Sequence, residues 1–370
     1  VSISVSGSNS YTIDTSNNVG IQTDVPAGTY SIAAQDIPGY SATISNSDAV
    51  LNTTGEVLSF TVTYIFSPAF IALGDATILY SNDGITWSAN MSHVNSSNLP
   101  VIYGRDAIKL DDEYIIVGNY NKYFITKNGH EWTEAGWPGA FGGSVVPAVV
   151  SDGSKMLAID SAGNFATAGY KYVDIVFSQV LTGPAFYGLT YYYKETTSTG
   201  YTVIVGDDDT VFSKIGSSAW ADVSPGLSTV YLNDVIALNA NKYFVVGSGG
   251  TVYYSFGIDD SGNWVNTSPT NVSTNLYGIS YYEYSSSNKK LIIVGASGTI
   301  AYNDSSPTTG DWTNVSITAE TNHFKGITAR EGVFVAVGTG GIIYHSEDGI
   351  SWTKATSDTT EDLYNVVSFN

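Results

Sequence analysis

The chain has 370 residues, no cysteine and a formal net charge of −20, from 34 acidic residues against 14 basic ones. The lack of cysteine excludes disulfides, zinc–thiolate sites and cysteine nucleophiles. Nucleic acid and anionic membrane surfaces are disfavoured as partners, because phosphate groups are bound by clustered Lys and Arg. No apolar run is long enough to cross a bilayer, so direct membrane insertion is not expected. Because residue 1 is Val, we expect a processed chain or a piece of a longer one.

Residues 1–66 are predicted to form a separate small β-sandwich module. Short alternating segments, such as residues 30–33 and 59–64, are divided by turn signals at Pro26-Ala27-Gly28 and Pro38-Gly39. This pattern is typical of antiparallel strands that bury one face. These segments resemble the small immunoglobulin-like modules of archaeal and bacterial surface proteins, and the resemblance implies a module that joins the chain to a larger assembly.

Residues 67–370 repeat one pattern at intervals of roughly 40–50 residues, a period typical of propellers and other arrays. One copy contains the opening segment 324–328, the apolar segment 334–338 and the hairpin 342–352, whose Asp348-Gly349 pair favours a tight turn. Asp160 replaces the glycine that closes the apolar segment in one copy. That glycine recurs in six copies, at Gly74, Gly118, Gly206, Gly247, Gly295 and Gly338. Seven copies of four short strands predict an all-β fold with a seven-bladed β-propeller.

The two ends of the repeat array are expected to meet. The first copy has no opening strand before Phe70, while the C-terminal segment 363–369 matches the opening strands of the other copies. This segment should therefore complete the first blade and close the ring, which removes the exposed strand edges of an open array. The long links between blades and the turns after the glycine-closed strands should share one face and carry the function.

Two hairpins, Ser81–Trp87 and Ser346–Trp352, resemble the Asp-box of sialidase-like propellers, and Thr126–Trp132 is a weaker copy. The family pattern has one residue between Asp and Gly, and here there is none. The repeated order of a Val-Gly strand end followed by an Asp-Gly-x-x-Trp hairpin is similar to that in propellers of the photosystem-assembly-factor type. The resemblance implies that the box is a structural turn remote from the binding site. Sialidase chemistry does not carry over, because those enzymes hold a substrate carboxylate with three Arg and this chain has only Arg105 and Arg330.

Aromatic side chains in the insertion 133–146 suggest a ligand site. Trp137 and Phe141 are flanked by glycine and could offer a stacking platform for a sugar or a protein partner. The alternative is that they pin the loop to the ring. Three tyrosines are expected on the same face. The candidate ligand-binding residues are Trp137, Phe141, Tyr120, Tyr170 and Tyr172.

Three adjacent carboxylates, Asp207, Asp208 and Asp209, follow a glycine-closed strand. They are candidate metal ligands, because oxygen ligands suit Ca²⁺, and a solvated acidic turn is the alternative. Together with Asp75 or Asp160, expected on the same face, they could also supply the two carboxylates of a glycoside hydrolase. No other cofactor is expected.

The function that we expect is non-catalytic recognition outside the cell, as in a virion host-attachment protein or a cell-surface adhesin that binds a glycan or protein. The composition, rich in Tyr, Ser, Thr and Asn, is similar to that of archaeal surface and viral proteins. The alternative is a glycoside hydrolase with paired carboxylates on the propeller face. Seven glycosylation sequons would permit a glycoprotein. They lie at Asn52, Asn90, Asn95, Asn266, Asn271, Asn303 and Asn314.

Overall fold

The computed structural model divides the chain into two compact units, Val1–Pro68 and Ala69–Asn370. Both are built of antiparallel β-strands. The structure describes residues 2–7, 11–14, 25–45, 48–53, 56–57, 59–89, 102–120, 122–129, 131–137, 141, 145–168, 175–179, 184–226, 229–258, 264–285, 288–304 and 310–369. Among these residues, no helix has the length and hydrophobicity needed to cross a lipid bilayer.

The first unit contains two antiparallel sheets. A four-stranded sheet has the order β2-β1-β3-β5, and a two-stranded sheet joins β4 to β6. The strands are β1 (Ser2–Gly7), β2 (Tyr11–Asp14), β3 (Gly28–Ala34), β4 (Tyr40–Ile44), β5 (Asp48–Leu51) and β6 (Val62–Phe66). Tyr30 and Ile32 are buried on β3 while their neighbours are exposed. This alternation places one face of the strand in the core of the unit.

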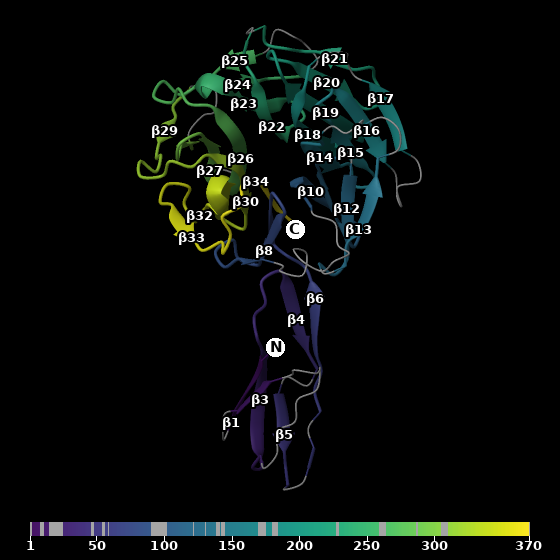
Figure 1. The fold of residues 1–370 in the computed structure, drawn as a ribbon, viewed down its shortest axis with the longest axis vertical. Coiled ribbons are helices and arrows are strands. Elements are labelled where there is room, and N and C mark those ends of the chain that lie inside the picture. Colours follow the sequence, from purple (N-terminus) through teal and green to yellow (C-terminus); the bar gives the residue numbers. More distant parts are fainter. Residues whose placement is uncertain are drawn as a thin grey trace. The chain divides into compact units, whose positions relative to one another are not determined.

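The second unit contains seven four-stranded sheets among the described residues, each a blade with its strands in chain order except for the first (Figure 1). The innermost strands are β34 (Leu363–Ser368), β10 (Gly104–Leu110), β14 (Ala148–Ser151), β18 (Phe186–Lys194), β22 (Leu232–Asn239), β26 (Leu276–Ser285) and β30 (Phe324–Arg330). The second strands are β7 (Phe70–Gly74), β11 (Glu113–Gly118), β15 (Met156–Ile159), β19 (Thr199–Gly206), β23 (Lys242–Gly247), β27 (Asn288–Gly295) and β31 (Val333–Gly338).

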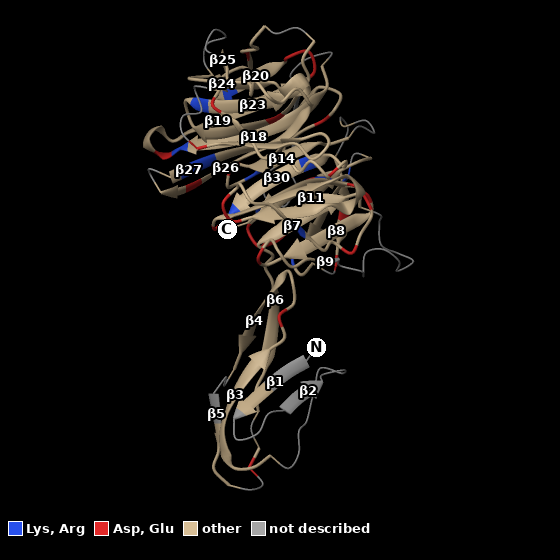
Figure 2. Cartoon of the chain, turned by 90° about the vertical axis from the view of Figure 1, so that its left-hand side faces the viewer, with Lys and Arg blue, Asp and Glu red and all other residues tan. Residues whose placement is uncertain are grey.

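The outer half of each blade consists of shorter strands. The third strands are β8 (Thr77–Ser81), β12 (Lys122–Thr126), β16 (Asn164–Ala168), β20 (Val211–Ile215), β24 (Val252–Ser255), β28 (Ile300–Asn303) and β32 (Ile343–Ser346). The outermost strands are β9 (Ser88–Ala89), β13 (Thr133–Gly136), β17 (Ile175–Gln179), β21 (Ala221–Asp222), β25 (Trp264–Asn266), β29 (Thr313–Asn314) and β33 (Thr353–Ala355). Short 3-10 turns occur at η3 (Glu195–Thr197), η4 (Ser248–Gly250) and η5 (Thr339–Gly341). Acidic residues, red in Figure 2, are distributed over several blades.

The C-terminal strand completes the first blade, as predicted. β34 pairs antiparallel with β7, with Val366 opposite Ala72 and Val367 opposite Ile71. The pairing continues beyond the strands, because the Phe369 N–H donates to the Ala69 carbonyl at 3.0 Å. The first sheet is therefore built from both ends of this unit.

The repeated glycine that ends six of the seven second strands is required by a close approach of the backbone. A Cβ atom on Gly338 would lie 1.9 Å from the carbonyl oxygen of His323, far inside van der Waals contact. A Cβ atom on any of the other five closing glycines would lie 1.9 to 2.2 Å from the corresponding carbonyl oxygen. Asp160, which replaces this glycine in one blade, instead accepts hydrogen bonds from Ala162 N and Asn164 N in its own turn.

The Asp-box hairpins are turns stabilised by an aspartate and a serine side chain. Asp348 Oδ1 accepts the N–H groups of Ile350 and Ser351, both at 2.7 Å, and Gly349 N donates to Ser346 Oγ at 2.8 Å. Although burial would raise the pKa of Asp348, these N–H donors hold it at about 2. Asp83 has the same contacts in the first blade. The boxes thus act as structural turns.

Candidate binding site at the mouth of the propeller channel

A cavity of about 690 Å³ runs along the axis of the propeller and is lined by residues of all seven innermost strands. Figure 1 shows these strands gathered around the centre of the ring. The volume is within the range of roughly 300–1,000 Å³ that is common for ligand sites. The side chains that line this cavity are therefore the first candidates for a binding function.

Six of the innermost strands carry a β-bulge at the same position near their start. In β30, Phe324 pairs with Gly338 and Gly326 with Val337, so Lys325 is an extra residue without a partner in the ladder. Such bulges change the direction in which a side chain points. The bulge residues are Arg105, Tyr187, Asn233, Tyr277, Lys325 and Tyr364. All six line the cavity, and because they share one register position they lie at one end of it, here named the mouth.

Four consecutive blades place aromatic and cationic side chains in alternation around the mouth. They contribute Tyr277, Lys325, Tyr364 and Arg105 in that order. Lys325 Nζ lies 3.6 Å from the ring centroid of Tyr277, and Arg105 Cζ lies 3.5 Å from that of Tyr364. The negative face of each ring therefore stabilises a cation from the next blade. This arrangement holds two positive groups in fixed positions around the mouth.

Two carboxylates that follow second strands also reach the bulge residues. Asp75 Oδ2 accepts the Tyr364 hydroxyl at 2.9 Å, and its Oδ1 is 3.4 Å from Arg105 Nη1. Asp207 Oδ1 accepts the Tyr187 hydroxyl at 2.6 Å. Burial raises the pKa of Tyr187, and the bond to Asp207 raises it further. The hydroxyl groups of these two tyrosines are thus held in place by carboxylates.

Exposed tyrosines surround the bulge residues at the same end of the blades. Tyr231 immediately precedes β22 and is 51% exposed, and Tyr120 follows β11 and is 63% exposed. The Tyr120 ring packs edge-on against Tyr103 at 5.7 Å between centroids. Exposed amphipathic rings of this kind are common where proteins bind partners.

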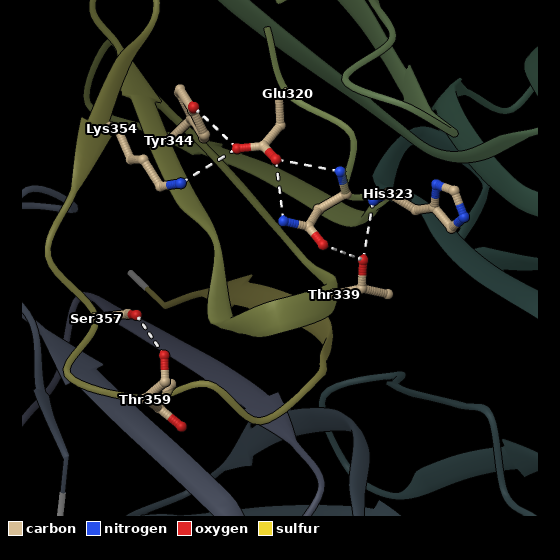
Figure 3. A network of polar contacts seen from close by, with 8 residues as sticks. Glu320, His323, Thr339, Tyr344, Lys354, Ser357 and Thr359 are labelled. Atoms are coloured by element: carbon tan, nitrogen blue, oxygen red, sulfur yellow. Dashed lines mark hydrogen bonds and ion pairs between the residues drawn. The ribbon is translucent and has the colours of Figure 1, made fainter.

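A polar network extends from the outer strands of the last blade toward the mouth (Figure 3). Glu320 Oε2 accepts the Tyr344 hydroxyl at 3.1 Å and Lys354 Nζ at 3.2 Å, and its Oε1 accepts the main-chain and side-chain N–H groups of Asn322. Burial opposes ionisation of Glu320, but these donors lower its pKa overall. The network therefore fixes the link that leads into β30.

The inner end of this network holds His323, which stands two residues before Lys325. Thr339 Oγ1 accepts the His323 N–H at 2.9 Å and donates to Asn322 Oδ1 at 3.4 Å. The His323 Nδ1 atom accepts the Ser297 N–H at 3.0 Å, so its other ring nitrogen carries the proton of the neutral imidazole. The ring centroid lies 6.4 Å from that of Tyr277. These bonds hold the start of β30 in place at the mouth.

Two half-buried carboxylates line the channel beyond the mouth. Asp106 Oδ2 accepts the N–H of Val149 in the next blade at 2.9 Å, and Asp234 Oδ2 accepts that of Ile279 in the same way at 2.9 Å. Burial raises the pKa of each to about 7, against the lowering effect of the N–H donors. Each carboxylate therefore joins two blades, and its oxygens are already occupied by donors.

The structure places the residues predicted as a ligand site in different environments. Trp137 and Phe141 are buried, at 2% and 0% exposure, with ring centroids 4.9 Å apart. This favours the alternative interpretation, in which these rings pin the insertion to the core, and neither ring is accessible for stacking. Tyr120 lies at the mouth, whereas Tyr170 and Tyr172 lie outside the described residues.

The three adjacent aspartates lie in three different environments in the structure. Asp207 is held by Tyr187, Asp208 is exposed and Asp209 is buried. No group of three or more His, Asp or Glu side chains comes within metal-binding distance among the described residues. The Ca²⁺ site at Asp207, Asp208 and Asp209 stays a prediction. Asp160, proposed as a partner carboxylate, is fully buried in its turn.

Sequence analysis missed the bulge residues and the two half-buried carboxylates, Asp106 and Asp234. The bulge residues occupy the second position of each opening segment. This position varies between Arg, Tyr, Asn and Lys while the residues around it repeat, and that variation could have indicated a functional role. A second signal was Asp106 and Asp234, which occupy a position that is Gly in three other blades. Neither feature could be assigned to the channel without knowing which way the bulge points.

Comparison with known proteins identifies the class of fold. No protein-family model and no curated protein matches the chain. Among solved structures, YCF48 bound to D1 peptide has a TM-score of 0.57 at 14% identity and covers 84% of this chain and 96% of its own. YCF48 from Cyanidioschyzon merolae has a TM-score of 0.57 at 9% identity and covers 74% and 89%. A streptogramin B lyase has a TM-score of 0.55 at 14% identity and covers 70% and 83%.

The likeness to these structures concerns the fold alone. The chain is an all-β protein whose larger unit is a β-propeller. The predicted resemblance to propellers of the photosystem-assembly type is confirmed at this level, because both YCF48 structures match across most of their length. The immunoglobulin-like character of the first unit stays a prediction.

Proposed function

We propose that this chain is a non-catalytic recognition protein that acts outside the cell and binds a protein or glycan partner through the mouth face of its propeller. The observation that carries the proposal is the mouth itself, where bulge residues from six blades present three tyrosines, an asparagine and two cations to one cavity. Such a mixture of aromatic and polar groups is typical of binding sites. A virion or cell-surface attachment protein remains the role that we favour.

Two further observations support this proposal. The similar structure of YCF48 was determined with a bound D1 peptide, so the propeller fold is compatible with binding of a protein segment. The chain enters the propeller at Ala69, beside Phe369, at the opposite end of the first blade from Gly74 and the mouth. The mouth face is therefore not the face at which the chain enters this unit.

The test is binding of the purified chain to glycan and peptide arrays, with two matched variants. Tyr231→Ser changes an exposed tyrosine at the mouth, and Tyr193→Ser changes one of similar exposure, 48%, at the far end of β18. We expect saturable binding that Tyr231→Ser weakens about 10-fold, as for a contact at the centre of an interface, and that Tyr193→Ser leaves unchanged.

Two outcomes would contradict the proposal. If both variants bind as well as the unchanged chain, the mouth is not the binding face. If any array glycan is cleaved, the glycoside hydrolase alternative replaces the recognition role, and the cleaving carboxylates would have to be sought by substitution of Asp75 and Asp207.

A further inference from the structure

The two cationic side chains at the mouth, Lys325 and Arg105, are not fully paired with carboxylates of the protein. Lys325 lines the cavity and is only partly exposed. Among the described residues, no carboxylate lies within ion-pair distance of it. The ring of Tyr277 stabilises the ammonium group, but a ring face offers no hydrogen-bond acceptor of carboxylate strength.

The second cation has a weak carboxylate partner. Arg105 contacts Asp75 through one nitrogen atom at 3.4 Å, and its side chain is only 17% exposed. A guanidinium group that binds a carboxylate fully does so through two parallel bonds of about 2.7–2.9 Å. Asp75 also accepts the Tyr364 hydroxyl at 2.9 Å. The forked donor of Arg105 therefore retains capacity for another anion.

The two cationic groups lie over different rings, Lys325 Nζ over Tyr277 and Arg105 Cζ over Tyr364. Lys325, Tyr364 and Arg105 come from consecutive blades, and all three line the cavity. Asp362, which precedes Tyr364, accepts the Gly340 N–H at 2.8 Å and so is engaged by the backbone of the last blade. An anionic ligand group that enters the mouth would therefore meet an ammonium group over Tyr277 and a guanidinium group over Tyr364.

We propose that the mouth binds its ligand through a carboxylate group that pairs with Lys325, while Arg105 supplies a second positive charge at the same end of the channel. This inference rests on the proposed function and names the chemistry of the group that is recognised. A carboxylate fits better than a phosphate, because its lower charge meets less repulsion from a chain of net charge −20. That repulsion is diffuse, since the acidic residues are spread over the blades (Figure 2), and it is screened beyond about 8 Å at physiological salt.

The test uses NMR titration of the full chain with two acid–neutral pairs, which separate the two sources of such a group. One pair is N-acetyl-trialanine as the free acid and as the amide, and the other is glucuronic acid and glucose. Lys325→Met removes the charge and keeps the apolar stem. Lys242→Met removes an equal charge from an exposed lysine at the far end of β23, and it controls for the change in net charge.

We expect at least one acid to bind about 10-fold more tightly than its neutral partner, the increment of a charge-assisted hydrogen bond. Lys325→Met should abolish that preference, and Lys242→Met should preserve it. Equal binding of acid and neutral forms, equal loss in both variants, or no saturable binding of either acid would overturn the inference. If array binding still depends on Tyr231 in any of those cases, the recognition role survives without the carboxylate.

Discussion

Individual carboxylates in this acidic chain differ in role according to their environment. Asp348 lies in a hairpin where backbone donors hold its pKa at about 2, against the effect of burial. Asp234 lies in the channel wall, where burial raises the pKa to about 7 even though it accepts two N–H groups. The sequence identifies the first as a turn residue through its Gly and Trp neighbours. It does not identify the second, because burial depends on strands more than 40 residues away.

The raised pKa values of Asp106 and Asp234 predict how stability depends on pH. Between about pH 4 and 7, an unfolded carboxyl with a pKa of 3.8 has lost its proton, whereas the folded one keeps it. Because the folded state then binds more protons, stability falls as pH rises through this window and levels off above about 7. We expect the free energy of unfolding in urea to decrease from pH 5 to pH 8.

A substitution isolates this contribution from the general effect of net charge. Asp234→Asn should reduce the slope between pH 5 and pH 8, while Asp208→Asn, which removes the same charge from an exposed turn, should leave the slope as it was. Identical slopes in the unchanged chain and in Asp234→Asn would show that Asp234 does not titrate in this range.

At the scale of the structural element, repetition made most of the strands predictable. Second strands such as β31 are buried throughout, from Phe334 to Gly338, and they appear in the sequence as short apolar runs that end in glycine. The bulges could not be predicted in the same way. An extra residue in an innermost strand does not alter the pattern of apolar and polar residues in the neighbouring strands, so the sequence carries no separate sign of it. The role of the insertion after Trp132 could not be decided from the sequence, because the same aromatic residues can pack inside a loop or form a ligand site.

The burial of Trp137 gives a prediction for this insertion. Trp137 packs against Tyr123 and Phe141, with ring centroids 5.2 and 4.9 Å away. Removing a buried ring of this size costs about 3–5 kcal/mol, because transfer energy is lost and a cavity remains. We expect Trp137→Ala to lower the free energy of unfolding in urea by that amount. Tyr120→Ala, at an exposed position, should change it by about 0.5 kcal/mol or less, and equal losses would contradict the assignment of Trp137 to the core.

At the scale of the whole molecule, the propeller depends on one pairing between its two ends. β34 supplies the innermost strand of the first blade and also packs on β30 of the last blade. The sequence predicted this pairing because the first repeat lacked an opening strand, and a missing element in a closed ring has to be supplied from elsewhere. The closure of the ring by the C-terminal strand could thus be predicted from the sequence repeats alone, without knowledge of side-chain contacts.

Removal of residues 363–370 tests the closure. Loss of β34 takes away the buried side chains Leu363 and Val366 and exposes the edge of β7, and exposed edges promote association. We expect the shortened chain to unfold at lower urea concentration and to form larger species in size-exclusion chromatography. A matched substitution, Tyr364→Phe, keeps the strand and removes only the hydroxyl bond to Asp75. It should remain monomeric if the unchanged chain is, and a truncated chain that behaves identically would refute closure by β34.

The adjacency of Ala69 and Phe369 determines how the first blade would respond to force if the chain holds a partner under tension, as proposed above. Pulling on these two neighbouring points would separate β7 from β34 one hydrogen bond at a time, as a zipper opens, because both lie at the same end of an antiparallel pair. Pulling between Ala69 and a partner bound at the mouth would instead apply force parallel to the strands, so that the hydrogen bonds of the blade share the force and are sheared at the same time. A tether attached only through the N-terminal side would therefore withstand more force than one attached at both ends.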